Sequence, residues 1–213
     1  MSISDEEIKE FVKYSTGNIC DANGKVGNVD PAIKPVNPRS RLAGKAVPVH
    51  CHPRDNLIML KAIYEVEPGS VLVYDIGGYV GAGPFGDVMA MACQQRGIAG
   101  VVIDGACRDA QDIEELGFPV FTRTYNPGGT VKETLGTINQ PVQCGGVVVY
   151  PGDVIVGDRD GVVVIASHKA REVLDKTKAL AQKEVEIREM LKQGKTMLEI
   201  YGFDRVLEQK GYK

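Results

Sequence analysis

Between residues 68 and 122, short apolar runs typical of buried strands alternate with segments of helical periodicity. This alternation favours a parallel sheet whose strands are connected through crossover helices, and it therefore predicts an α/β fold. The expected strands cover 68–75, 100–104 and 119–122, and the expected helices cover 86–96 and 109–116.

The flanking segments extend this arrangement without dividing it. A capping box from Ser4 to Glu7 predicts a short first helix, and three prolines make residues 28–41 a connecting loop. No linker separates the parts, so we expect one domain over residues 1–213 with a C-terminal helical extension over 168–213. Further strands are expected over 44–50, 145–149, 154–156 and 161–165, and helices over 55–65, 168–193, 196–201 and 203–210.

Composition limits the class of protein. A net charge of −3 gives no support to a nucleic-acid or membrane-surface partner. The longest apolar runs, such as 145–150, are too short to span a bilayer, and the acidic start lacks a signal-peptide pattern. The 5 cysteines are never spaced as CxxC, which favours reduced, mostly buried thiols in a cytoplasmic protein.

A glycine-bearing loop over residues 81–87 leads into one of the expected helices. The backbone N–H groups at a helix N-terminus are unpaired and attract an anion such as a carboxylate, and the amides of Val88 and Met89 fall there. Asp87 has two interpretations of about equal weight, as the N-cap of this helix or as a functional carboxylate.

Arg108 and Asp109 follow the strand expected over 100–104. Ligands in open α/β sheets bind at the carboxyl ends of strands, where an arginine can hold a carboxylate or a developing enolate. The alternative is that Asp109 only caps the next helix. If Asp87 and Asp109 converge, Arg108 or a metal must offset their repulsion, and all-oxygen ligation suits Mg²⁺ or Mn²⁺.

Glu184 lies in line with an apolar stripe on the long helix. A carboxylate in such a stripe is costly unless it is paired. It either pairs with Arg188 one turn later or faces an active site of the same or a neighbouring subunit, and both interpretations stay open. The stripe comprises Val173, Thr177, Leu180, Ile187 and Leu191.

Two histidines, His50 and His52, are expected on one face of a strand. Two ligands are too few to predict a zinc site, so surface or core histidines are favoured.

The combination of Asp87, Arg108 and Asp109 with the preceding Gly83–Gly86 resembles the 4-hydroxy-4-methyl-2-oxoglutarate / 4-carboxy-4-hydroxy-2-oxoadipate aldolases, a group related to the regulator of ribonuclease activity A. The similarity runs over most of the chain and includes segments 51–56, 117–121, 135–141, 151–158 and 183–188.

The resemblance implies a compact α/β fold of stacked β layers flanked by helices (a swivelling β/β/α-like fold). It implies a homotrimer or homohexamer with active sites between subunits. The implied activity is divalent-metal-dependent, class II cleavage of a 4-hydroxy-2-oxo diacid to pyruvate and a second oxo-acid, with oxaloacetate decarboxylation as a companion. The small-molecule partner would be a 2-oxo diacid and the cofactor Mg²⁺ or Mn²⁺.

The resemblance also implies roles for individual residues. Asp109 would bind the metal directly, while Asp87 and Glu184, the latter from a neighbouring subunit, would bind it through water. Arg108 would stabilise the enolate, and Asp87 joins it in the catalytic set. The substrate carboxylate would lie on the amides of Val88 and Met89, which follow Gly86.

Three positions bear on the choice of function. The ribonuclease-regulator branch typically has glycine where this chain has Asp87, which favours an enzyme over a non-catalytic regulator that binds a protein partner. The family often has glycine and histidine where this chain has Arg54 and Leu60. Both lie in a segment that could face the substrate.

Overall fold

A nearly closed β sheet forms the centre of the computed structural model, which describes residues 3–212. Within these residues the sheet has 8 strands in the order β1-β5-β4-β3-β2-β9-β10, with β6 pairing beside β2. Strand β1 also contacts β9 and β10, which brings the two ends of the sheet together. The strands are β1 (Lys34–Pro35), β2 (Leu42–His50), β3 (Ser70–Tyr79), β4 (Gly100–Cys107), β5 (Val120–Tyr125), β6 (Thr137–Ile138), β9 (Val154–Asp158) and β10 (Gly161–Ile165).

The predicted alternation of strands and helices is confirmed. Strands β2, β3, β4 and β5 are parallel to one another, and helices α3 (Leu57–Ile63), α4 (Asp87–Gln95) and α5 (Ala110–Leu116) connect them. Strand β4 is buried at every position and β3 over most of its length, which explains why these two strands appear in the sequence as continuous apolar runs. The largest core cluster lies between the three helices and the sheet, and Tyr74 and Phe85 are fully buried in it.

A small hairpin adds a second β layer on the other face of the sheet. It consists of β7 (Val142–Cys144) and β8 (Val147–Val149), and β7 contacts β3 and β2. The sequence predicted a single strand over 145–149, which is wrong at its start. Gly145 and Gly146 form the turn instead, with φ of 53° and 81°, values that glycine adopts at little cost.

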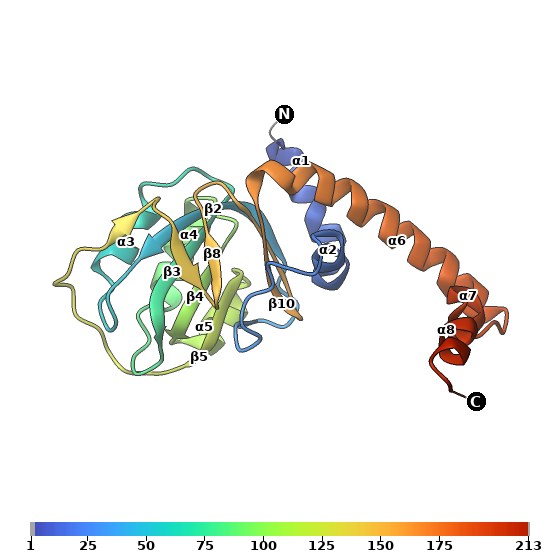
Figure 1. Ribbon diagram of the computed structural model, residues 1–213. Coiled ribbons are helices and arrows are strands. Elements are labelled where there is room, and N and C mark those ends of the chain that lie inside the picture. Colours follow the sequence, from blue (N-terminus) through green and yellow to red (C-terminus); the bar gives the residue numbers. More distant parts are fainter. Residues whose placement is uncertain (1–2, 213) are drawn as a thin grey trace.

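The C-terminal helices form an arm that leaves the body of the molecule (Figure 1). Helix α6 (Ala170–Lys192) packs its first half against α2 (Thr16–Ala22), where Val173 and Thr177 are buried. Helices α7 (Met197–Tyr201) and α8 (Phe203–Gln209) lie at its far end. The capping box predicted at Ser4 and Glu7 starts helix α1 (Asp5–Glu10).

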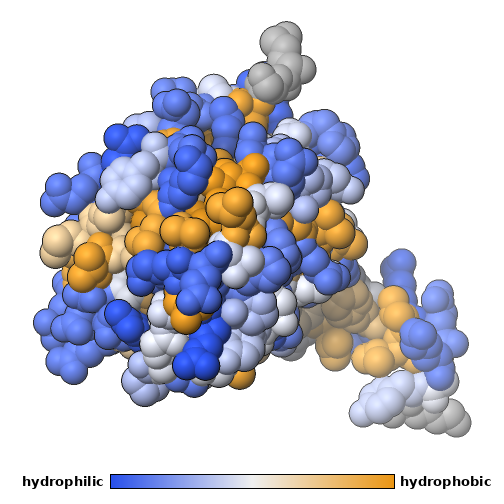
Figure 2. Space-filling view, turned by 90° about the vertical axis from the view of Figure 1, so that its left-hand side faces the viewer, coloured by the Kyte–Doolittle hydropathy of each residue, from blue (hydrophilic) through white to orange (hydrophobic). Residues whose placement is uncertain are grey.

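Apolar side chains gather in the middle of the face that carries α3, on the opposite side of the body from the arm (Figure 2). Large apolar residues are also exposed on the arm, among them Met197, Leu198, Phe203 and Val206. None of the helices described over residues 3–212 is both long enough and apolar enough to cross a membrane.

Candidate active site

Arg108 and Asp109 stand at the carboxyl end of β4, directly after Cys107. The Arg108 side chain is 46% exposed and that of Asp109 is 33% exposed, so both can reach a ligand from solvent. Nε of Arg108 lies 3.3 Å from Oδ2 of Asp109. The guanidinium therefore neutralises part of the carboxylate charge.

Asp109 is held in the left-handed region, with φ of 56° and ψ of 40°, where non-glycine residues are uncommon. It occupies the N-cap position of α5, but its side chain makes no capping hydrogen bond. Asp109 is therefore the N-cap by its backbone position only, and its carboxylate is available to another partner. Left-handed strain of this kind often marks functional sites.

Asp87 is the first residue of α4, and Gly86 is the N-cap, so Asp87 does not cap this helix. The first main-chain hydrogen bond of α4 runs from Ala90 N to Gly86 O, at 3.0 Å. The amides of Val88 and Met89 precede this bond and belong to the unpaired donors of the first turn. This helix end favours an anion.

The two loops meet at close range. The Arg108 amide donates to the Phe85 carbonyl at 2.9 Å. A Cβ built on Gly86 would overlap Oδ2 of Asp109, and one built on Gly83 would crowd the backbone of Arg108. Glycine at both positions is what lets the loop before Asp87 lie directly on Arg108 and Asp109.

Asn56 binds the loop before Asp87 through the Pro84 carbonyl, a contact that the sequence did not predict. The residue is 8% exposed, and its Nδ2 donates to the Pro84 carbonyl at 2.9 Å. Its Oδ1 is buried without a hydrogen-bond partner. The local signal was an asparagine at the start of a helix, where the N-cap interpretation is the usual one, and here that side chain makes no cap hydrogen bond.

Asp55 anchors the neighbouring loop. Its carboxylate accepts hydrogen bonds from the amides of Leu57, Glu133 and Thr134 at 2.9, 2.8 and 2.7 Å. Burial pushes the pKa of Asp55 upward, but these backbone donors outweigh it and hold the pKa below its usual value. Asp55 is therefore a charged structural anchor.

Glu184 lies on the arm, on the second half of α6. Its Oε2 accepts from Arg188 at 2.7 Å, so the pairing alternative for this residue is realised within one chain. Residues 3–212 contain no group of three or more histidine, cysteine, aspartate or glutamate side chains that could hold a metal ion. The chain by itself thus brings the loop before Asp87 against Arg108 and Asp109, and leaves Glu184 elsewhere.

The histidine pair lies at the end of β2. The rings of His50 and His52 are 6.0 Å apart, and Nδ1 of His50 lies 3.4 Å from Oδ2 of Asp75. Both histidines are exposed, which is one of the two placements, surface or core, that the sequence favoured.

The cysteines are free, as expected, and all but Cys20 are buried. Burial raises the pKa of Cys93 and of Cys107 to about 12.

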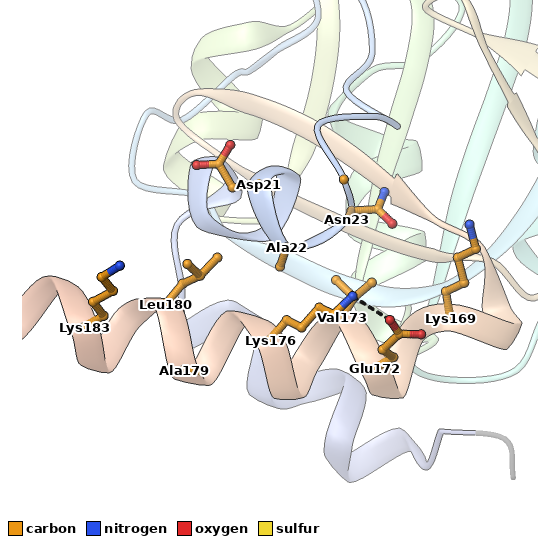
Figure 3. A pocket seen from close by; sticks show the side chains of 11 residues that line it. Asp21, Ala22, Asn23, Lys169, Glu172, Val173, Lys176, Ala179, Leu180 and Lys183 are labelled. Carbon is orange, nitrogen blue, oxygen red and sulfur yellow. Dashed lines mark hydrogen bonds and ion pairs between the residues drawn. The ribbon is translucent and has the colours of Figure 1, made fainter. Parts of the chain in front are cut away.

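Two cavities lie away from Arg108 and Asp109. One, of about 600 Å³, runs between the end of α2 and the first half of α6, with Lys169, Lys176 and Lys183 along one side (Figure 3). The other, of about 700 Å³, lies at the amino ends of β3 and β4, next to α1. Open α/β sheets bind ligands at the carboxyl ends of their parallel strands. We therefore place the candidate active site at the loops that carry Arg108 and Asp109 and not at either cavity.

Comparison with protein-family models assigns residues 16–164 to the family described as RraA-like, Aldolase/RraA. A protein of Halalkalibacterium halodurans, named "Putative 4-hydroxy-4-methyl-2-oxoglutarate aldolase", is 41% identical over 171 residues, which cover 80% of this chain and 81% of that protein.

Two solved structures share the fold. An uncharacterized protein from Pseudomonas syringae pv. tomato is 28% identical, with a TM-score of 0.85 over 93% of this chain and 94% of that one. The RNA-processing inhibitor RraA from Thermus thermophilis is also 28% identical, with a TM-score of 0.66 over 71% of this chain and 92% of that one. The predicted α/β fold and the resemblance stated from sequence are confirmed.

Proposed function

The chain belongs to the RraA-like family of aldolases and RraA proteins, and we propose that it is a divalent-metal-dependent lyase of the class II type. It cleaves a 4-hydroxy-2-oxo diacid to pyruvate and a second oxo-acid, and it decarboxylates oxaloacetate through the same pyruvate enolate. The contact of the loop before Asp87 with Arg108 and Asp109 carries this proposal. It gathers two acidic residues, a guanidinium and a helix N-terminus at one strand end.

Different groups of the chain bind the substrate carboxylate and stabilise the developing negative charge. The amides of Val88 and Met89, after Gly86, hold the carboxylate of the 2-oxo acid, because the first turn of α4 leaves them unpaired. Arg108 lies against the oxygen on which negative charge develops as the bond β to the ketone breaks. A donor at that place lowers the barrier by about 2.7–4 kcal/mol.

The acidic residues fit a hard divalent cation. The Asp109 carboxylate makes no capping hydrogen bond and is one-third exposed, and carboxylate oxygens are the donors that Mg²⁺ and Mn²⁺ prefer. Asp109 would bind the ion directly, and Asp87 and the Glu184 of a neighbouring subunit would hold it through water. The ion, when bound, supplies Lewis-acid stabilisation of the developing charge.

We propose that the active form is a homotrimer or homohexamer. Glu184 lies on the arm of its own chain, so a neighbouring copy must supply it to complete the metal site. Exposed apolar side chains support such an assembly, since Val88 and Met91 on α4 are 75% and 52% exposed beside Asp87.

The test is pyruvate release from oxaloacetate and from a 4-hydroxy-2-oxo diacid, coupled to lactate dehydrogenase. EDTA should abolish release, and Mg²⁺ or Mn²⁺ should restore it. Asp109→Asn should lose activity, whereas Asp112→Asn, an exposed aspartate in the first turn of α5, should keep it. Full activity in EDTA, or inactivation by borohydride in the presence of substrate, would indicate a lysine imine and overturn the class II assignment.

The second candidate is a non-catalytic regulator of ribonuclease activity that binds a protein partner. Its support is the structural likeness to the RNA-processing inhibitor RraA from Thermus thermophilis. A folded protein that turns over neither substrate with Mg²⁺ or Mn²⁺, yet inhibits a ribonuclease in a processing assay, would establish this function instead.

A further inference from the structure

We propose that the partly buried ion pair of Asp104 and Arg123 positions Arg108 and Asp109 toward the substrate. This inference rests on the proposed lyase function for its kinetic consequences. Its structural part, that the pair fixes the carboxyl end of β4, can be measured without any activity.

The first observation is a break in regular pairing on both sides of β4, just before Arg108. Between Ile103 and Ala106, β4 advances three residues while β5 advances two, from Thr122 to Thr124. On the other side, the partner of β4 shifts from Asp75 to Tyr79 while β4 itself advances by one residue. Such irregularities redirect the residues that follow, and they recur beside active sites.

The second observation is that one side chain holds this irregular stretch. Asp104 is 6% exposed. Its Oδ1 accepts from Arg123 Nε at 2.5 Å, and its Oδ2 accepts from the Gly145 amide at 2.7 Å, in the turn of the β7–β8 hairpin. One carboxylate thus joins β4 to β5 and to the second β layer.

Neighbouring contacts restrict the same stretch further. Arg123 Nη1 donates to Asp30 Oδ2 at 2.6 Å, so its planar guanidinium is held at two points. Thr122 Oγ1 donates to the Gly105 carbonyl at 2.7 Å. A Cβ on Gly105 would overlap the Ile76 side chain, so the chain can take this path only with glycine there.

A buried ion pair is weak evidence for stability, because removing both charges from water offsets much of their attraction. Its clearer effect is to permit one geometry. Here the geometry permitted is that of the end of β4, from which Arg108 and Asp109 project four and five residues after Asp104. A small misplacement of such groups can cost about 10²-fold in rate.

The experiment compares Asp104→Asn with Asp158→Asn. Asp158 is a matched control on β9: it is 7% exposed, and it likewise accepts from a backbone amide and a side chain, those of Thr16, at 2.9 and 2.7 Å. Both variants keep the shape of the side chain and lose its charge. Both should lower the melting temperature, so stability alone does not separate them.

The structural readout is hydrogen exchange of the peptide that covers residues 104–109, followed by mass spectrometry. Its Arg108 amide donates to Phe85 O in the parent protein. Asp104→Asn should speed exchange in this peptide about tenfold, and Asp158→Asn should leave it unchanged. Unchanged exchange in Asp104→Asn would overturn the proposal, whether or not the protein is a lyase.

The kinetic readout is oxaloacetate decarboxylation at saturating Mg²⁺. Asp104→Asn should lower kcat by about tenfold to 10²-fold with little change in KM, because the α4 amides that hold the substrate carboxylate are not displaced. Asp158→Asn should keep the parent kcat. Arg123→Lys should lower kcat less than Arg123→Met does. Equal kcat losses in the Asp104 and Asp158 variants would overturn a positioning role. A parent protein without activity would refute the lyase proposal and leave the exchange result to decide this one.

Discussion

Oδ2 of Asp109 occupies the space into which a side chain on Gly86 would project. Gly86 has φ of −136° and ψ of −174°, which is extended backbone that any residue adopts. The requirement for glycine here is therefore steric and comes from the candidate site itself.

Gly86→Ala should consequently damage the site without straining the backbone. The added methyl group must displace the Asp109 carboxylate, and we expect kcat/KM for oxaloacetate to fall about 10²-fold, with a higher half-saturating Mg²⁺ concentration. Steady-state kinetics over a range of Mg²⁺ concentrations measures both. Gly129→Ala is the control, because a Cβ at that position meets nothing within 4 Å. Equal activity of the two variants would mean that the position of Asp109 is unimportant.

Arg108 offers the clearest test of transition-state stabilisation. Arg108→Ala should lower kcat by roughly 10²–10³, the range observed when a single transition-state donor is removed. Arg108→Lys keeps the charge but loses the planar fork, so it should also lose most turnover. The effect on pyruvate affinity should be smaller, which product-inhibition constants can measure. A kcat within a few-fold of the parent in folded, metal-bound Arg108→Ala would make Arg108 a structural partner of Asp109.

The alternation of strands and helices was readable from sequence because parallel strands buried on both faces are continuous apolar runs. The first segments were harder. Helix α2 was missed because its apolar content is low, and its stability comes from packing on α6 and from Asp158, which accepts from the Thr16 amide across 142 residues. Strand β1 lies in a segment that the sequence predicts to be a loop, since a two-residue strand that contains Pro35 carries no periodicity.

The candidate site was predictable in part. The pattern of a strand end or glycine-bearing loop followed by charged residues and a helix indicated Asp87, Arg108 and Asp109. The parallel order of the strands explains why their two loops meet. Asn56 and Asp104 were not predicted, because their roles depend on Pro84, Arg123 and Gly145, contacts that only the folded chain creates. The place of Glu184 in an assembled site stays a prediction.

Assembly can be tested through Glu184. We expect a trimer or hexamer by multi-angle light scattering, with Glu184 near Asp109 of another copy. Glu184→Gln should reduce Mg²⁺ affinity and activity, whereas Glu186→Gln, an exposed neighbour on another face of α6, should not. A fully active 23 kDa monomer would refute the shared site.

Thiol accessibility follows from burial. Burial raises the pKa of all 5 thiols, but Cys20 is partly exposed, while Cys51, Cys93, Cys107 and Cys144 are buried. Because the thiolate is the reactive form, native protein at pH 8 should react with a disulfide reagent at one site. All 5 thiols should react after unfolding. Cys20→Ser should remove the native reaction, and rapid labelling of Cys107 in that variant would contradict the packing of the β4 end.

The last prediction concerns the acid stability that Asp55 supplies. Its folded-state pKa lies below the usual value, because three backbone amides outweigh the effect of burial. A depressed carboxyl pKa contributes stability that is present at neutral pH, above the unfolded pKa of about 3.9, and is lost as pH falls through the folded value. Asp55→Asn should therefore lower the free energy of unfolding at pH 7 by about 1–3 kcal/mol. The difference from the parent should shrink at pH 3.

Urea unfolding of both proteins at pH 7 and pH 3 measures this difference directly. Asp175→Asn, an exposed aspartate on α6, serves as the control and should differ little from the parent at either pH. The sign of the pH dependence separates the two explanations for a weaker Asp55 variant. If the loss came from altered packing alone, it would be the same at both pH values, because packing does not titrate. A constant difference between pH 7 and pH 3 would thus show that the charge of Asp55 does not hold the loop at Glu133 and Thr134.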